Sequence, residues 1–146
     1  MQTVAHILHS KASQAVSHIG PTAPVLDALK LLAERGIGAL LVMEDEQIIG
    51  IVSERDYTRK VELLGRSASN TPVSDIMTSS VICVGPGNNN EECMALMTQN
   101  RLRHLPVVEN GKLLGLISIG DLVKDIISEQ QFTIEQLEHY IHGARS

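Results

Sequence analysis

Two stretches of the sequence end on the same polar pattern, a serine followed three positions later by an aspartate. They are GIVSERD at residues 50–56 and GLISIGD at residues 115–121. A short apolar run precedes each serine, which predicts that the serine ends a strand and that the aspartate lies in the first turn of a helix. Backbone N–H groups and the helix dipole attract anions at such a position, and a carboxylate accepts hydrogen bonds from ribose hydroxyls. The two motifs are therefore candidate binding sites for the phosphate and ribose of a nucleotide.

The same residue types also suit a purely structural role. Serine as N-cap with an acidic residue three positions later is an ordinary capping arrangement, and a duplicated fold duplicates its caps. Gly50 and Gly115 begin the two motifs and allow close approach of another backbone or of a flat ring. The residues alone leave ligand binding and helix capping both open.

The motifs belong to a longer internal repeat. Residues 21–61 align with residues 86–126 without a gap, and VAHIL at 4–8 resembles VSDIM at 73–77. Each copy predicts a strand, a helix, two strands and a second helix, so we expect one domain at 4–64, a second at 73–128, and a C-terminal helix and tail at 129–146. A sheet of this size leaves one face uncovered, so we expect the two sheets to pack on each other.

Local signals place the elements of each copy. Helices are predicted over residues 24–36 and 90–100, with Gly36 as a C-cap and a run of asparagines (88–90) capping the start of the other helix. Asn110 and Gly111 predict a tight hairpin. Short strands are expected at 16–19 and 81–84, and helices at 54–64 and 119–129 follow the two motifs. A separate amphipathic helix is expected over 132–142, with Thr133 as N-cap and Gln136 three residues on.

The composition argues against several classes of function. The formal charge is -5 and the pI about 5.6, which disfavours nucleic-acid binding. No apolar stretch approaches the about 20 residues that span a membrane, and residues 1–13 lack a secretory signal. Two cysteines are too few for a disulfide framework. We therefore expect a soluble, cytoplasmic protein with no membrane partner.

The duplicated unit, closed each time by the serine–aspartate motif, resembles a tandem pair of cystathionine β-synthase (CBS) domains. IGALLV (37–42), LRHLPVVENGKLLG (102–115) and VSDIMT (73–78) are similar to that family, over residues 4–128. ERDYTRKV, MTQNRLRHLPV, SIGDLVK and QLEHYIHG resemble a group of stand-alone CBS-pair proteins of bacteria and plant organelles. The resemblance implies a mixed α/β fold, with two βαββα repeats in pseudo-twofold symmetry and their sheets packed together.

The resemblance also implies adenine nucleotides in clefts between the repeats. Serine would contact phosphate or sugar, aspartate the ribose hydroxyls, and the opposing repeat would contribute the strand after its first helix. Residues 11–17 and 79–82 would border the adenine. The residues implied for the first cleft are Ser53, Asp56, Arg103 and His104; for the second, Ser118, Asp121, Gly38 and Ala39; and for the borders, Lys11, Ser79 and Val81.

The two clefts are expected to differ in charge. Arg55 lies within the first motif and Arg103 is assigned to the same cleft, whereas Gly120 and Gly38 stand at the matching places of the second. Because guanidinium groups form strong, often bidentate contacts with phosphate, we expect the first cleft to prefer ATP or NAD(H). The second, with only Lys11 as a cation, should prefer a monophosphate such as AMP.

These features predict a regulatory module that senses adenine nucleotides and modulates an unidentified effector protein, rather than an enzyme. The resemblance further implies a homodimer through helices, supported by these apolar positions: Leu122, Val123, Ile126, Ile127, Ile134, Leu137 and Ile141. The alternative is a thiol-dependent redox protein using Cys83 or Cys93, or a regulator of the thioredoxin system. Free buried cysteine is the default expectation for both thiols. His139 and His142 suggest surface or packing histidines rather than metal ligands.

Overall fold

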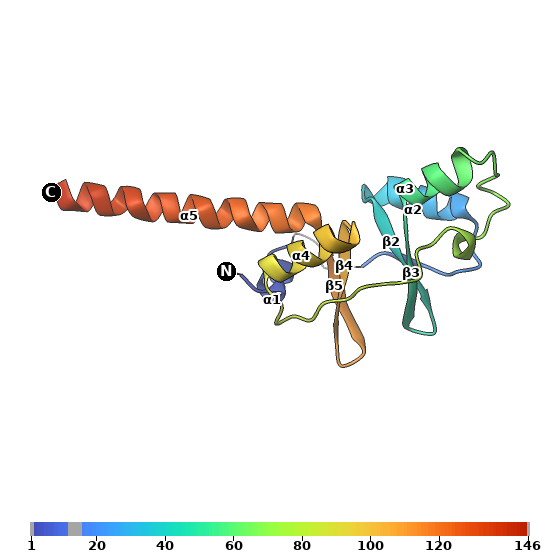
Figure 1. Cartoon of the computed structure of the whole chain (residues 1–146), viewed down its shortest axis with the longest axis horizontal. Helices are drawn as coiled ribbons and strands as arrows, with labels where there is room; N and C mark the ends of the chain where they lie inside the picture. Colours follow the sequence, from blue (N-terminus) through green and yellow to red (C-terminus); the bar gives the residue numbers. More distant parts are fainter. Residues whose placement is uncertain (1, 12–15, 146) are drawn as a thin grey trace. The chain divides into compact units, whose positions relative to one another are not determined.

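The computed structural model describes residues 2–11 and 16–145, with side chains up to Ile141. The chain forms two compact units (Figure 1). Ala15–Ile82 make up one, called here the first-repeat unit; Met1–Gln14 together with Cys83–Ser146 make up the other, the second-repeat unit. The segment that opens each sequence repeat therefore packs in the unit formed by the rest of the other repeat.

The first-repeat unit contains a three-stranded sheet. Its strands are β1 (His18–Ile19), β2 (Ala39–Glu44) and β3 (Gln47–Ser53), in that order, with β1 parallel and β3 antiparallel to β2. Helix α2 (Val25–Arg35) connects β1 to β2. The chain leaves β3 through α3 (Glu54–Tyr57) and the π-helix η1 (Thr58–Glu62), and returns through the 3-10 helix η2 (Val73–Asp75).

The second-repeat unit follows the same order with a smaller sheet. Strands β4 (His104–Glu109) and β5 (Lys112–Ser118) form an antiparallel pair, and Val84 makes a single parallel bridge to Val107 where β1 would lie. Helix α4 (Asn90–Asn100) precedes β4, and α5 (Ile119–Arg145) follows β5. Helix α1 (Val4–Ser10), from the start of the chain, contacts both β5 and α5.

Several local predictions are confirmed by the backbone. Gly36 ends α2 in the left-handed region with φ 63°, where a residue without Cβ meets least strain. Asn89 caps α4, its side chain accepting from the N–H of Glu92. Asn110 and Gly111 both have positive φ, as a tight hairpin between β4 and β5 requires.

Two expected helices differ from the structure. The segment after Ser53 is α-helical for only four residues before it widens into η1. The expected terminal helix is not separate, because α5 runs without a break from Ile119 to Arg145. Thr133 is therefore not an N-cap; it lies inside the helix and its hydroxyl donates to the carbonyl of Glu129 at 3.0 Å.

The core of each unit is aliphatic, as expected from a sequence with 2% aromatic residues. In the first-repeat unit Leu40, Val42 and Val52 from the sheet pack with residues of α2, η1 and η2 in one buried cluster. In the second-repeat unit the buried side chains include Leu105, Val107, Ile117, Leu122 and Cys93. The mixed α/β class is confirmed, and the first repeat has the expected order of elements. In the second repeat the strand expected at 81–84 is wrong, because only Val84 makes an isolated bridge there. The packing of one sheet on the other stays a prediction.

Candidate functional site

The first serine–aspartate motif lies where β3 passes into α3. The backbone N–H of Asp56 donates to Oγ of Ser53 at 3.2 Å, and Oδ2 of Asp56 accepts from the backbone N–H of Ser53 at 2.9 Å. The Ser53 hydroxyl also donates to this oxygen, at 3.0 Å. These reciprocal bonds form a capping box, so the capping role is realised.

The second motif has the same reciprocal geometry at the start of α5. The backbone N–H of Ser118 donates to Oδ2 of Asp121 at 2.9 Å, and the backbone N–H of Asp121 donates to Oγ of Ser118 at 3.1 Å. Capping does not exclude ligand binding, because a carboxylate has about four acceptor positions and only part of them is used here. The cap fixes the hydroxyl and the carboxylate relative to the helix N-terminus in both units.

A lysine ammonium group lies against each motif aspartate. Nζ of Lys60 is 3.4 Å from Oδ1 of Asp56 and donates to the carbonyl of Ile76 at 2.9 Å. Nζ of Lys11 is 2.9 Å from Oδ2 of Asp121 and donates to the carbonyl of Leu116 at 2.7 Å. We call residues 2–11 and 73–82 the exchanged segments, because each opens one repeat but packs in the unit of the other. Ile76 and Lys11 lie in these segments, so each lysine links a motif to the opening segment of the other repeat.

The surroundings of the second motif shift two pKa values. Burial acts to raise the pKa of Asp121, but hydrogen bonds from Ser118 and the Lys11 ammonium outweigh it and hold this pKa below its ordinary value. Burial lowers the pKa of His104; the Asp121 carboxylate opposes this shift, while the charges of Lys11 and Arg103 add to it. The second motif is therefore a partly buried group of interacting charges.

The strand beside each motif comes from the same unit. Ala39 pairs with Ser53 across β2 and β3, and His104 pairs with Ser118 across β4 and β5. The backbone N–H of the residue after each serine donates to the residue just before the paired strand. Glu54 donates to the carbonyl of Gly38 at 3.2 Å, and Ile119 donates to the carbonyl of Arg103 at 2.9 Å.

Within the first-repeat unit, therefore, Gly38 and Ala39 border the first motif. Within the second-repeat unit, Arg103 and His104 border the second motif. The family resemblance assigned each pair to the opposite motif. The assignment of Arg103 and His104 to the first motif, and of Gly38 and Ala39 to the second, concerns the opposing repeat and stays a prediction. The own-unit neighbours follow from the Asn110–Gly111 hairpin, whose register sets His104 opposite Ser118.

The remaining predicted residues have varied surroundings. The side chains of Arg55 and Arg103 are exposed, as is that of Ser79, whereas Val81 is half-buried. The backbone N–H of Val81 donates to the carbonyl of Ser79 at 3.1 Å. Of the expected adenine border at 11–17, residues 12–15 lie outside the described part of the chain.

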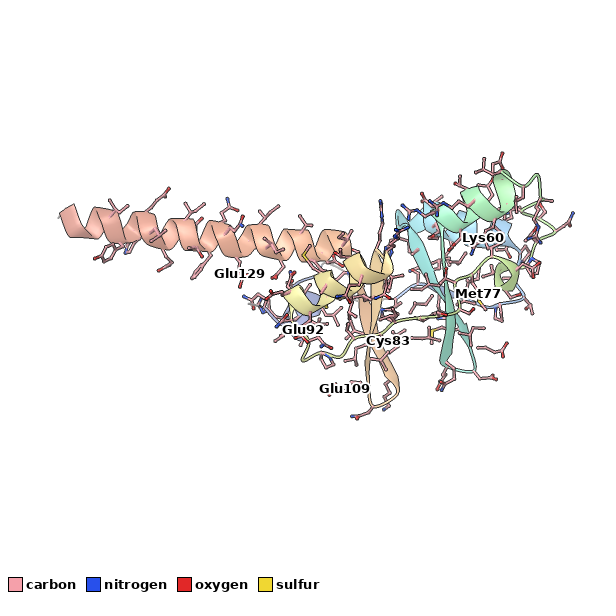
Figure 2. The ribbon with its side chains drawn as sticks, in the orientation of Figure 1. Lys60, Met77, Cys83, Glu92, Glu109 and Glu129 are labelled. Carbon is pink, nitrogen blue, oxygen red and sulfur yellow. The ribbon has the colours of Figure 1, made fainter. Side chains whose placement is uncertain are left out.

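Close approach at the two motif glycines is confirmed, but by side chains of the same unit. A Cβ on Gly50 would lie 2.6 Å from Sδ of Met77, a residue labelled in Figure 2. A Cβ on Gly115 would lie 2.7 Å from Cδ2 of Leu8. Leu8 and Met77 are matching residues of the VAHIL and VSDIM segments, so both glycines make room for the exchanged segments rather than for a flat ring.

The cysteines and histidines give little support to other chemistry. Cys93 is buried as expected, but Cys83 is exposed, so the expectation for Cys83 was wrong. Desolvation raises the pKa of both thiols, which disfavours the thiolate form. Among the side chains that the structure describes, residues 2–11 and 16–141, no cluster of three His, Cys, Asp or Glu is suited to a metal. His139 is exposed, and the side chain of His142 lies outside the described residues.

The described residues include no helix that is both long and apolar enough to cross a membrane.

Comparison with known proteins identifies the family. The sequence model of the CBS-domain family matches residues 5–62 and again residues 73–128. The chain therefore belongs to the CBS-domain family and contains two copies of the domain, as the sequence resemblance predicted.

Related proteins of known sequence align with most of this chain. The CBS domain-containing protein CBSX3, mitochondrial, of Arabidopsis thaliana is 40% identical over 124 residues, which cover 82% of this chain and 60% of the relative. The chain thus spans about 60% of the length of that plant protein. The CBS domain-containing protein YhcV of Bacillus subtilis is 29% identical over 115 residues, covering 79% of this chain and 81% of the relative.

Solved structures confirm the fold. A protein with CBS domains from Burkholderia ambifaria matches with a TM-score of 0.86 at 55% identity, covering 91% of this chain and 99% of that one. A hexameric CBS-CP12 protein from cyanobacteria matches with a TM-score of 0.73 at 32% identity, covering 83% and 70%. The CBS pair of protein MJ0100, in complex with 5'-methylthioadenosine and S-adenosyl-L-methionine, matches at 0.75 over 88% and 98%; at 18% identity this likeness concerns the fold alone.

Proposed function

We propose that this protein is a regulatory module that binds adenine nucleotides at its two serine–aspartate motifs and passes the bound state to a partner protein. The observation that supports this most directly is the matched geometry of the motifs. In both units a serine hydroxyl and an aspartate carboxylate are held together at the first turn of a helix. Such a position suits a phosphate and a ribose in one ligand.

CBS domains generally bind adenine nucleotides as regulatory modules, and the fold neighbour MJ0100 binds two adenosine-containing ligands. Which ligand this chain binds is part of the proposal. We assign ATP or NAD(H) to the cleft that holds Ser53, Asp56 and Arg55, because Arg55 is exposed and free to meet a charged phosphate chain. We assign AMP to the cleft with Ser118 and Asp121, whose nearby cation, Lys11, already pairs with the carboxylate.

The proposal includes how the module acts in a cell. It has no catalytic role of its own, it works as a homodimer joined through helices, and it acts in the cytoplasm on an effector protein of unknown identity. Exposed apolar residues on α5 support the homodimer. The plant relative is mitochondrial by name.

Isothermal titration of the purified protein with AMP, ADP, ATP, NAD(H) and S-adenosylmethionine tests the proposal. We expect saturable binding with a Kd well below about 1 mM for at least one of them, and weaker binding in Asp56→Asn or Asp121→Asn. Absence of saturable binding to all of these ligands would refute it. A thiol-dependent function has less support, because partial desolvation raises the pKa of both Cys83 and Cys93 and so disfavours the reactive thiolate.

A further inference from the structure

Helix α5 extends beyond the rest of the second-repeat unit (Figure 1). All side chains from residue 130 to residue 141 are exposed, so this part of the helix gains no core contacts from its own unit. Figure 2 shows the side chains past Glu129 standing around the helix, with no other element of the unit beside them. Because an isolated helix shorter than about 15 residues is marginal in water, this segment needs another surface to stabilise it.

One stripe of α5 has the spacing of a coiled coil. We call it the seam; its positions are separated alternately by four and three residues, and its members are Val123, Ile127, Gln130, Ile134, Leu137 and Ile141. The five apolar members are between 43% and 57% exposed. The seam is distinct from the face of α5 that packs on its own unit, where Leu122 is buried and Asp125 accepts from the side chain of Asn90.

We propose that the seam pairs with the seam of a second copy of this chain, and that the two helices run antiparallel. Such a pair has a two-fold axis close to residue 132, which makes the interface self-complementary. Val123 then packs against Ile141 of the second copy, and Ile127 against Leu137. Gln130 lies opposite Ile134 and reaches solvent at the edge of the seam with its amide group. The inference makes the proposed homodimer specific and does not depend on nucleotide binding.

Charge selects the antiparallel orientation. Lys124 and Glu138 are exposed and flank the seam on the same side, one near each end of the paired segment. In an antiparallel pair Lys124 lies beside Glu138 of the second copy, and symmetry repeats this contact. In a parallel pair Lys124 would lie beside Ile119 instead, and the attraction would be lost. The other acidic residues of α5 do not occupy the positions that flank the seam.

The place where α5 joins its unit agrees with this orientation. Asn90 of α4 donates to the carbonyl of Leu122 and to the carboxylate of Asp125, so the body of the unit contacts the early turns of α5. In an antiparallel pair the two bodies that hold these early turns lie at opposite ends of the coil. The exposed turns of each helix are then covered by the helix of the other copy.

Sedimentation velocity of the full chain tests the seam. We expect wild type to sediment as a dimer of the 15.9 kDa chain, and the double variant Ile134→Asp with Leu137→Asp to weaken the dimer by at least about 100-fold in Kd. Phe132→Asp is the matched control, because Phe132 is 62% exposed on the same helix but lies off the seam. A dimer unaffected by the double variant overturns the seam and leaves the proposed homodimer standing, whereas a monomeric wild type contradicts both.

Disulfide cross-linking tests the orientation in a Cys83→Ser background, which leaves only the buried Cys93. Gln131 lies beside the seam close to the two-fold axis, so Gln131→Cys should cross-link to itself across an antiparallel pair. Val123→Cys should cross-link only if the helices are parallel. Failure of Gln131→Cys to cross-link, or efficient cross-linking of Val123→Cys, overturns the antiparallel arrangement.

A charge exchange between Lys124 and Glu138 tests the antiparallel orientation independently. Lys124→Glu should weaken the dimer, and adding Glu138→Lys should restore it, because the opposite charges again face each other between copies. The two residues are 14 positions apart on one helix, about 21 Å, too far for the rescue to arise within one chain. Lack of rescue in the double variant would also overturn the antiparallel pairing.

Discussion

The ammonium nitrogen of Lys11 lies 2.9 Å from a carboxylate oxygen of Asp121, although 110 positions separate the two residues in the sequence. The first-repeat unit achieves a similar pairing differently, with Lys60 one helical turn after Asp56. In the repeat alignment Lys60 corresponds to Asp125, so the two lysines do not occupy equivalent positions. The repeats therefore differ in sequence here but agree in using a lysine to link the motif aspartate to an exchanged segment. Lys11 belongs to one such segment, and Lys60 donates to the carbonyl of Ile76 in the other.

Replacing Lys11 should loosen α1 from the second-repeat unit. In Lys11→Met the Asp121 carboxylate loses its cation while remaining partly buried, and we expect a loss of about 1–2 kcal/mol in the free energy of unfolding. Urea denaturation measures this loss. Lys112→Met is the matched control, because Lys112 is exposed on β5 in the same unit and should change stability little. Equal stability of both variants and wild type would show that the ion pair contributes nothing.

His104 should make stability depend on pH. Because the folded protein holds the pKa of His104 below its ordinary value of 6.5, the unfolded chain binds the proton more readily. Stability should therefore fall as pH drops through 6.5, and level off once His104 is also protonated in the folded state.

The test compares free energies of unfolding at about pH 7.5 and about pH 5.5. His104→Gln should show a smaller loss over this range than wild type, because it removes the titrating group. His139→Gln, which alters an exposed histidine on α5, should keep the wild-type dependence. If His104→Gln and wild type lose the same stability, other groups cause the pH dependence.

Much of the fold could be predicted from the sequence because the deciding interactions are local. Gly36 and Asn89 mark helix ends by their own backbone and side-chain preferences, and Asn110 with Gly111 specifies a hairpin. The π-helix after Tyr57 was not predicted, since its residues have the same apolar spacing as an ordinary helix. The continuity of α5 was not predicted, because a threonine such as Thr133 can occupy either an N-cap or an interior position of a helix. Here Thr133 is interior, and its hydroxyl donates to the backbone carbonyl of Glu129.

The candidate site was predicted as a set of residue types rather than as a set of contacts. The reciprocal bonds between Ser53 and Asp56 follow from a spacing of three, which is why a capping box could be anticipated. The family resemblance placed Lys11 in the cleft of Asp121, but their ion pair does not follow from local spacing, because it depends on where the exchanged segment packs. The same packing brings Leu8 against Gly115, and nothing local in the sequence indicates which side chain fills that space.

Substitution of Asp56 should separate ligand binding from capping. Asp56→Ala removes the acceptor of the capping box, so we expect about 1 kcal/mol of lost stability, more than an aspartate on an open surface would cost. It should also weaken nucleotide binding by about 1.5–3 kcal/mol, because the ribose loses a charged acceptor. Thermal unfolding and calorimetric titration measure the two effects.

The control for Asp56 is a capping box that belongs to neither motif and lies in the other unit. Glu92 accepts from the N–H of Asn89 at the start of α4 in the same reciprocal arrangement. Glu92→Ala should therefore lose similar stability and bind nucleotide like wild type. If Asp56→Ala also binds like wild type, capping is the whole role of that carboxylate.

Gly115 should not tolerate a side chain while Leu8 is present. In Gly115→Ala the added Cβ would meet Cδ2 of Leu8 at 2.7 Å, so Leu8 or the backbone must shift, at a cost of about 1–3 kcal/mol. The double variant with Leu8→Ala should be less destabilised than the sum of the two single variants. Gly87→Ala is the control, because no atom lies within 4 Å of its added Cβ. Simple additivity would show that Leu8 and residue 115 do not interact.

Arg55 should discriminate between ligands by their phosphate charge. Its side chain is exposed on α3, one residue before Asp56, so a ribose held by that carboxylate would place its phosphates within reach of the guanidinium. Because a guanidinium binds a polyphosphate more strongly than a single phosphate, Arg55→Ala should weaken ATP or NAD binding by more than it weakens AMP binding.

The size and the salt dependence of this effect provide the test. We expect a loss of about tenfold in ATP affinity for Arg55→Ala, little change for adenosine, and a shallower salt dependence than in wild type, since one exposed charge contact has been removed. Arg59→Ala is the matched control, because Arg59 is exposed four residues later on η1 and carries the same charge. Titrations of both variants with ATP, AMP and adenosine at two salt concentrations separate local contact from net charge. Equal losses in the two variants would mean that overall charge, and not a contact made by Arg55, attracts the phosphates.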